Sequence, residues 1–150
     1  MELILWRHAE AEDGAPDSAR KLTDKGVKQA QGMAAWLRLR LPENTRIIAS
    51  PTERTQQTAA ALDGRFETVK EIGPSASAKS ILVAAGWPEA KGAVVVVGHQ
   101  PTLGEVAALL LSGDLRGWGV RKGAVWWFSH KKKGDIAEVI LRTSISPDML

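Results

Sequence analysis

Apolar residues follow two different patterns along this chain. Short runs rich in β-branched residues predict strands, and longer stretches in which apolar residues recur every three or four positions predict helices. Strands are expected at residues 2–6, 46–49, 66–72, 93–97, 124–130 and 136–142. Helices are expected at residues 24–41, 52–62, 78–85 and 102–111. The predicted order is therefore β-α-β-α-β-α-β-α-β-β.

Strands that alternate with helices are typical of an α/β fold. We expect a three-layer sandwich in which helices cover both faces of a mostly parallel sheet. The all-apolar run at 93–97 suits a strand that is covered on both faces. A short basic segment at 131–135 joins the last two strands, which are expected to form an antiparallel hairpin at the C-terminal edge of the sheet. No repeat or linker divides the chain, so residues 1–150 are expected to form a single domain.

The composition narrows the class of protein. The chain has 150 residues, of which 44% are hydrophobic and 25% charged, as in an ordinary globular domain. It has no cysteine, which excludes disulfides, thiolate metal sites and a cysteine nucleophile. The net charge of +3 is too small to indicate a nucleic-acid partner. No apolar run reaches the roughly 18 residues of a membrane span, and the first residues do not resemble a secretory signal. We therefore expect a cytoplasmic monomer with no membrane partner.

Polar side chains follow three of the expected strands directly. They are Arg7 and His8 after the first strand, Arg54 in the helix after the second, and His99 after the strand at 93–97. The carboxyl ends of parallel strands meet at one edge of a sheet, so these side chains are expected to converge. Guanidinium forks match phosphate oxygens, and a neutral histidine is a competent nucleophile. Taken singly, each residue could be structural, but together at one edge they favour a phosphoryl-transfer site.

Four motifs, in chain order, resemble those of the histidine phosphatase superfamily, which has the phosphoglycerate-mutase-like fold. They are Arg-His-Ala at 7–9, Leu-Thr-Asp-Lys-Gly-Val-Lys-Gln-Ala at 22–30, Ser-Pro-Thr-Glu-Arg-Thr-Gln-Gln-Thr at 50–58, and Val-Gly-His at 97–99. The resemblance covers about residues 2–112, and the four motifs together are specific. The short chain and its segments 17–23 and 98–103 look like the small SixA-type phosphohistidine phosphatases.

This resemblance implies a role for each residue at the expected site. His8 is the nucleophile that accepts the phosphoryl group, and Arg7, Arg54 and His99 hold the phosphate. Arg20 is a further candidate for substrate binding. The implied substrate is phosphohistidine on a protein, and no metal or cofactor is expected.

The sequence departs from the family pattern at two places, and the second departure leaves the general acid open. Ala9 stands where the family has glycine, and the segment 62–93 has no insertion that could supply the acidic residue of the mutase-type members. Asp17 is the candidate acid, with Glu10 as a weaker one. An imidazole leaving group has a conjugate-acid pKa of about 6.5, so phosphohistidine needs less help from an acid than a phosphate ester does. Without a capping insertion, we also expect an open site that a protein-borne phosphohistidine can enter.

Other functions stay open at this point. One is a small-molecule phosphomonoesterase of the same fold, and another is a phosphoprotein-binding module that has lost turnover, although binding alone would need only the arginines. A metal hydrolase using His8, Glu10, Asp13 and His99 is disfavoured, because the spacing matches no known ligand set and two arginines would repel a cation. The lack of a Gly-x-x-x-x-Gly-Lys-Ser/Thr motif excludes a P-loop enzyme.

Overall fold

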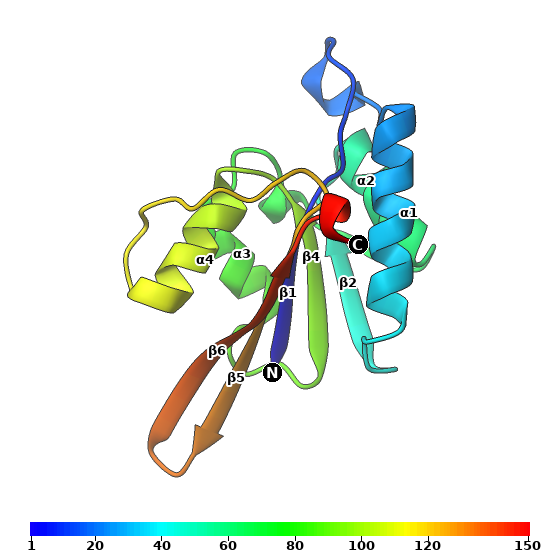
Figure 1. The fold of residues 1–150 in the computed structure, drawn as a ribbon. Helices are drawn as coiled ribbons and strands as arrows, with labels where there is room; N and C mark the ends of the chain where they lie inside the picture. Colours follow the sequence, from blue (N-terminus) through cyan, green and yellow to red (C-terminus); the bar gives the residue numbers. More distant parts are fainter.

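Six strands form one sheet in the computed structural model, which describes residues 1–150 (Figure 1). The strands are β1 (Glu2–Arg7), β2 (Thr45–Ala49), β3 (Glu67–Thr68), β4 (Ala93–Gly98), β5 (Val125–Lys133) and β6 (Ile136–Ile145). Their order across the sheet is β3-β2-β4-β1-β5-β6. The first four strands in this order are parallel, β5 is antiparallel to β1, and β6 is antiparallel to β5. The mostly parallel sheet with an antiparallel hairpin at one edge is therefore confirmed.

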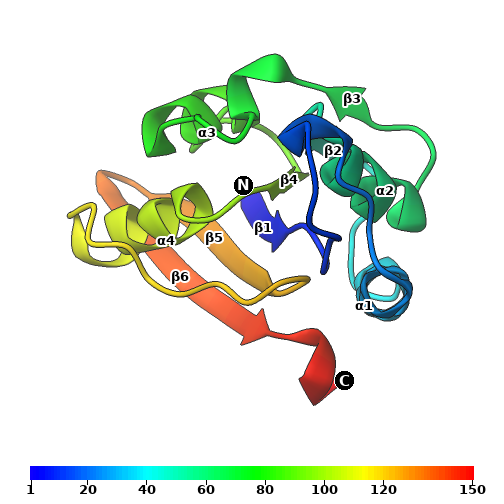
Figure 2. The same ribbon diagram turned by 90° about the horizontal axis from the view of Figure 1, so that it is seen from above.

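Helices cover both faces of this sheet, as the alternating pattern predicts (Figure 2). The α-helices are α1 (Asp24–Arg38), α2 (Glu53–Leu62), α3 (Ala78–Ala85) and α4 (Thr102–Ser112). Short 3-10 turns lie at η1 (Asp17–Ala19), η2 (Lys70–Ile72) and η3 (Pro147–Met149). No helix is both long and apolar enough to cross a membrane.

Successive residues of the strands enter two separate cores. In β1, Leu3 and Leu5 pack with α3 and α4, whereas Ile4 and Trp6 pack with α1 and α2. Every residue of β4 is buried, because this strand lies in the middle of the sheet and helices cover both of its faces. The uninterrupted apolar run of β4 thus follows from its place in the fold.

Two expected elements differ from the structure. The strand expected at 66–72 has only two residues, because the chain leaves the sheet edge and turns so that Ile72 enters the core beside α3. The first helix ends at Arg38 rather than at residue 41, and its Val27, on the expected apolar face, is 37% exposed. Thr23 does cap this helix, since its side chain accepts a hydrogen bond from the N–H of Gly26.

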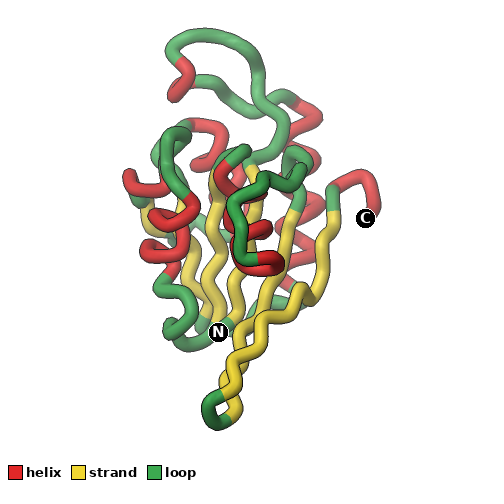
Figure 3. Tube along the Cα trace, turned by 90° about the vertical axis from the view of Figure 1, so that its left-hand side faces the viewer, coloured by secondary structure: helices red, strands yellow, loops and turns green.

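The C-terminal hairpin is longer than its apolar pattern indicates. Its strands continue to Lys133 and Ile136, so that the turn contains only Gly134 and Asp135. Gly134 has a φ of 60°, which suits the first position of a tight two-residue turn. Beyond His130, which still exchanges hydrogen bonds with Met1, β5 pairs with β6 alone, and this two-stranded ribbon projects from the body of the molecule (Figure 3).

The central strands bring distant segments to one edge of the sheet. β4 lies between β1 and β2 and is parallel to both, with Arg7 paired to Gly98 and Ala49 paired to Val97. All three strands therefore end at the same level. The residues that follow them, His8, His99 and Ser50, leave the sheet side by side.

Candidate active site

The two histidines expected at the sheet edge lie next to each other. The ring centroids of His8 and His99 are 5.4 Å apart, and the ring planes are inclined by 56°. Both residues are nearly buried, with exposed fractions of 6% and 4%. The backbone N–H of His8 donates to the carbonyl of Gly98, which fixes the ends of the two strands to each other.

The ring of His8 is held in one tautomer. Its Nδ1 lies 2.7 Å from the carbonyl oxygen of Ala9, and because a carbonyl only accepts, Nδ1 carries the hydrogen. The lone pair is therefore on Nε2. Burial is the largest cause that lowers the pKa of His8 from 6.5 to about 4, and the positive charges of Arg54, Arg7 and Arg20 lower it further. His8 is thus neutral at pH 7, as a nucleophile must be, and desolvation contributes more to this than the arginines.

Two arginines beside the histidines have free donor groups. Arg54 is 4% exposed, and its Nη2 lies 3.5 Å from Nδ1 of His99. Nη1 of Arg7 donates to the carbonyl of Val120. The Nε–H groups of both arginines are buried and have no hydrogen-bond partner. Such a group costs about 1–3 kcal/mol, and two neighbouring guanidiniums repel each other. An oxyanion at this place would relieve both effects.

His99 is held in place by Ser50, a residue whose side-chain chemistry alone did not mark it as part of the site. The hydroxyl of Ser50, which is fully buried, lies 2.8 Å from Nε2 of His99. Burial, followed by the charges of His8 and Arg54, lowers the pKa of His99 from 6.5 to about 3. His99 is therefore neutral at rest, not the imidazolium that would add a positive charge. Ser50 opens the motif at 50–58 and follows β2, so its place at the strand end was the available signal.

Asp17 connects Arg20 with Arg54. Its carboxylate accepts from Arg20 and from Arg54, both at 3.1 Å, and its backbone carbonyl accepts from Nη1 of Arg54. These hydrogen bonds, that of Arg20 first, lower the pKa of Asp17 below its usual range. Asp17 is thus ionised at neutral pH, which argues against the general-acid hypothesis and favours a role in positioning Arg54. Arg20 is connected to the site through this carboxylate.

The expectation of an open site is met in part. The side chain of Asp17 is 59% exposed at the rim, and that of Arg20 is 24% exposed. The two histidine rings lie deeper and are nearly buried. A substrate therefore meets the Asp17 and Arg20 side chains before it reaches His8.

Motif residues on the helices fix the backbone that follows His8. The hydroxyl of Thr58 accepts from the N–H of Ala9, and the side-chain oxygen of Gln29 accepts from the N–H of Glu10. Gly26 packs so closely that a Cβ atom there would lie 2.0 Å from the carbonyl oxygen of Glu10. No residue other than glycine has a positive φ, so Ala9 stands without backbone strain where the family pattern has glycine.

The four residues weighed for a metal site do not assemble. The Glu10 carboxylate accepts from the hydroxyl of Thr23, which also makes it a poor candidate for the general acid. No three of the His, Asp and Glu side chains come together in a group that could hold a metal ion. The structure therefore does not support the hypothesis of a metal hydrolase using His8, Glu10, Asp13 and His99.

Known proteins are similar to this chain in both sequence and fold. Residues 3–75 match the model of the histidine phosphatase superfamily, branch 1. Phosphohistidine phosphatase SixA of Escherichia coli (strain K12) is 31% identical over 123 residues, which cover 76% of each chain. The SixA homolog of Haemophilus influenzae is 33% identical over 126 residues, covering 73% of this chain and 77% of its own.

Solved structures of SixA proteins have a similar fold. A SixA structure from Nakamurella multipartitia has a TM-score of 0.75 and 27% identity, covering 97% of this chain and 95% of that one. The structure of SixA complexed with tungstate has a TM-score of 0.76, with 99% of both chains covered; at 24% identity it supports the fold. On its motifs, its fold and these matches, the chain belongs to the histidine phosphatase superfamily (branch 1), within which it resembles the SixA phosphohistidine phosphatases.

Proposed function

We propose that this histidine phosphatase removes the phosphoryl group from phosphohistidine on a protein, through a covalent intermediate on Nε2 of His8. The observation that carries the proposal is the ring of His8, with Nδ1–H bound to the Ala9 carbonyl and an unprotonated Nε2 beside two arginines and His99. The SixA relatives bear the name phosphohistidine phosphatase, which supports this substrate class.

In the first step, Nε2 of His8 attacks the phosphorus atom. The new N–P bond forms as the P–N bond of the substrate breaks, and its electron pair goes to the leaving imidazole, which takes a proton from solvent. Arg7 and Arg54 stabilise the oxygens of the transferring group, and His99 adds to this once the bound anion favours its protonated form. Such charge stabilisation is most of what phosphoryl transfer requires. The hydrogen bond from Nδ1 to the Ala9 carbonyl favours the positive charge that develops on His8.

In the second step, water attacks the phosphorus atom of phosphorylated His8. The P–Nε2 bond breaks, its electron pair returns to Nε2, and inorganic phosphate leaves with the oxygen of the water. The leaving group is an imidazole in both steps, so neither step needs a carboxylic acid with a raised pKa. This agrees with the ionised state of Asp17. We propose accordingly that the reaction needs no metal ion.

A trapping experiment tests the proposal. The wild-type protein and its His8→Ala variant are mixed with a protein carrying ³²P-phosphohistidine, quenched in alkali and analysed for label. We expect label on His8 of the wild type, turnover that persists in a chelator, and a loss of turnover by on the order of a thousandfold or more in the variant. Full turnover by His8→Ala would refute the mechanism. Much faster hydrolysis of sugar phosphates than of the phosphoprotein would instead indicate a small-molecule phosphatase.

A further inference from the structure

A second hollow adjoins the phosphate site on the side of Arg7. It has a volume of about 430 Å³, and no apolar side chain other than that of Pro147 lines it. Its charged residues are the four cations Arg7, Lys25, Arg121 and Lys122 and the two carboxylates Glu10 and Asp148. We call it the basic hollow.

Of the two carboxylates in the basic hollow, one is held in an ion pair and the other by a hydroxyl group. Asp148 forms an ion pair with Arg121 at 3.1 Å, and the Glu10 carboxylate accepts from Thr23. Lys25 and Lys122 are exposed, and neither takes part in an ion pair. Two ammonium groups therefore face solvent without a carboxylate of this chain in direct contact with either, and the four cations of the hollow outnumber its two carboxylates.

A segment that lines the basic hollow is hydrogen-bonded to the backbone around His8. The N–H of Gly123 donates to the carbonyl of His8, and the N–H of Arg7 donates to the carbonyl of Ala124. The segment that carries Arg121 and Lys122 is thus fixed to the end of β1. Lys25 precedes Gly26, which packs against the backbone of Glu10 two residues after His8. Both lysines therefore belong to segments that contact the backbone around His8, and both line the same hollow as Arg7.

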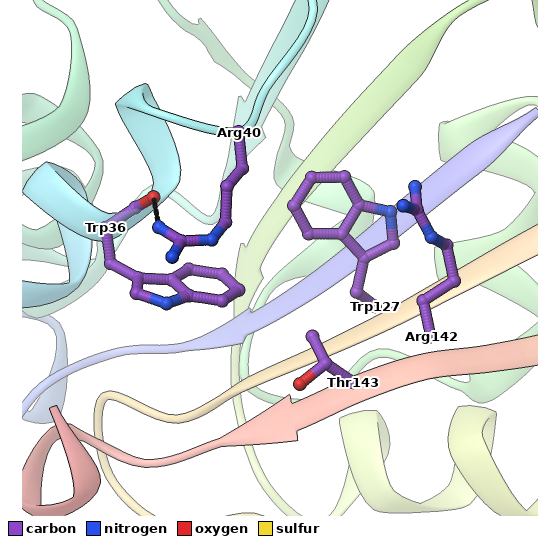
Figure 4. Close-up of a pocket in the computed structure, with 5 residues that line it drawn as sticks. All are labelled: Trp36, Arg40, Trp127, Arg142 and Thr143. Atoms are coloured by element: carbon purple, nitrogen blue, oxygen red, sulfur yellow. Dashed lines mark hydrogen bonds between the residues drawn. The ribbon is translucent and has the colours of Figure 1, made fainter.

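Another hollow of about 370 Å³ has two cations but a different setting (Figure 4). Arg40 stacks over the ring of Trp36, with 4.3 Å from its guanidinium carbon to the ring centroid, and Arg142 forms an ion pair with Glu2. Glu2 begins β1, whereas His8 follows its end, so this hollow lies toward the other end of the strand. Of the two, the basic hollow alone is placed to contact a substrate that is bound at His8.

We infer that the basic hollow binds acidic side chains that flank the phosphohistidine of a protein substrate. This inference rests on the proposed function and adds a preference among phosphoproteins. Exposed lysines attract carboxylates without fixing their geometry. Acidic flanking residues are therefore expected to raise the affinity and the association rate more than the rate of the chemical step. Each exposed ion pair is worth roughly a factor of two to five in affinity. It weakens with salt, because the Debye length shrinks.

Binding of peptides tests the inference apart from turnover. Two labelled peptides carry the same non-hydrolysable phosphohistidine analogue, one flanked by Asp and Glu and the other by Ser and Gly. Their Kd values are measured by fluorescence anisotropy. For the wild type we expect the acidic peptide to bind about four- to twenty-fivefold more tightly than the neutral one, since each of the two lysines contributes one such factor. For Lys25→Glu/Lys122→Glu we expect this ratio to fall to about one or below, because the attraction is reversed.

A matched control separates this local effect from net charge. Lys131→Glu/Lys132→Glu changes the charge equally at the exposed end of the projecting hairpin. We expect this variant to keep the wild-type ratio. Equal binding of the two peptides by the wild type, or an equal loss in both double variants, would overturn the inference. Turnover of phosphoimidazole by the wild type tests the proposed function separately, since that substrate has no flanking residues.

Discussion

The hydroxyl of Thr58 accepts a hydrogen bond from the backbone N–H of Ala9 at 3.1 Å. The same hydroxyl donates to the carbonyl of Arg54, one helical turn earlier, at 2.7 Å. The Ala9 carbonyl in turn accepts from Nδ1 of His8. One threonine side chain thus connects the backbone of a phosphate-binding arginine with the peptide that sets the tautomer of the nucleophile.

Replacing Thr58 by valine keeps the shape but removes both hydrogen bonds. We expect the free energy of unfolding to fall by about 1–3 kcal/mol, because the buried N–H of Ala9 loses its partner. We also expect kcat to fall on the order of tenfold with little change in KM, since His8 is less well aligned. Thr58→Ser, which keeps the hydroxyl, should restore kcat. A valine variant with unchanged kcat would contradict this positioning role.

Protonation of the buried histidines couples stability to pH. The pKa values of His8 and His99 are lowered from 6.5 to about 4 and about 3 in the folded protein. Between these values and 6.5 the unfolded chain binds more protons than the folded one, so stability is complete above pH 6.5 and decreases as the pH falls through this range. Urea unfolding at pH 7.5 and pH 5 should show the decrease. It should be smaller in His8→Ala, and an identical decrease in both proteins would show that other groups cause it.

The Asp17→Asn variant separates the two roles considered for this carboxylate. It removes a negative charge that contacts Arg54 at 3.1 Å, where an incoming anion must bind. We expect tungstate or phosphate to bind about three- to tenfold more tightly, since a repulsion is lost. We expect kcat on phosphohistidine to change little, because the amide oxygen of Asn and the backbone carbonyl of residue 17 still accept from Arg54 and keep it in position. A general acid would instead be revealed by a loss of roughly a hundredfold or more in kcat.

Gly26 and Gly32 lie on the same helix but have different surroundings. A Cβ atom at Gly26 would meet the Glu10 carbonyl at 2.0 Å, whereas at Gly32 the nearest atom, on Leu150, would be 3.6 Å away. We expect Gly26→Ala to lower the free energy of unfolding by about 1–3 kcal/mol, and to lower activity because the backbone after His8 must move. Gly32→Ala should be neutral or stabilising by up to about 1 kcal/mol, because alanine favours helices. Urea unfolding of both variants measures the difference.

The sequence was most informative where chemistry and topology coincide. His8 and His99 could be placed together because each directly follows a strand of a parallel sheet, and the arginines could be selected by their affinity for phosphate. The hydroxyl of Ser50 acts through one hydrogen bond and that of Thr58 through two, and such common polar residues carry no chemical signal of their own. The predicted length of the strand at 66–72 was wrong, because the burial of Ile72 is a tertiary effect that local strand propensity does not include.

The pairing of β1 with β4 has a consequence for the folding of the enzyme during its synthesis. These neighbours in the sheet are far apart along the polypeptide, with α1, β2, α2, β3 and α3 between them. Contacts between such distant segments slow folding, because a long loop must close before they form. A chain still emerging from the ribosome carries His8 long before Gly98 and His99 exist. The nascent protein therefore holds an incomplete centre until residue 99 has been added.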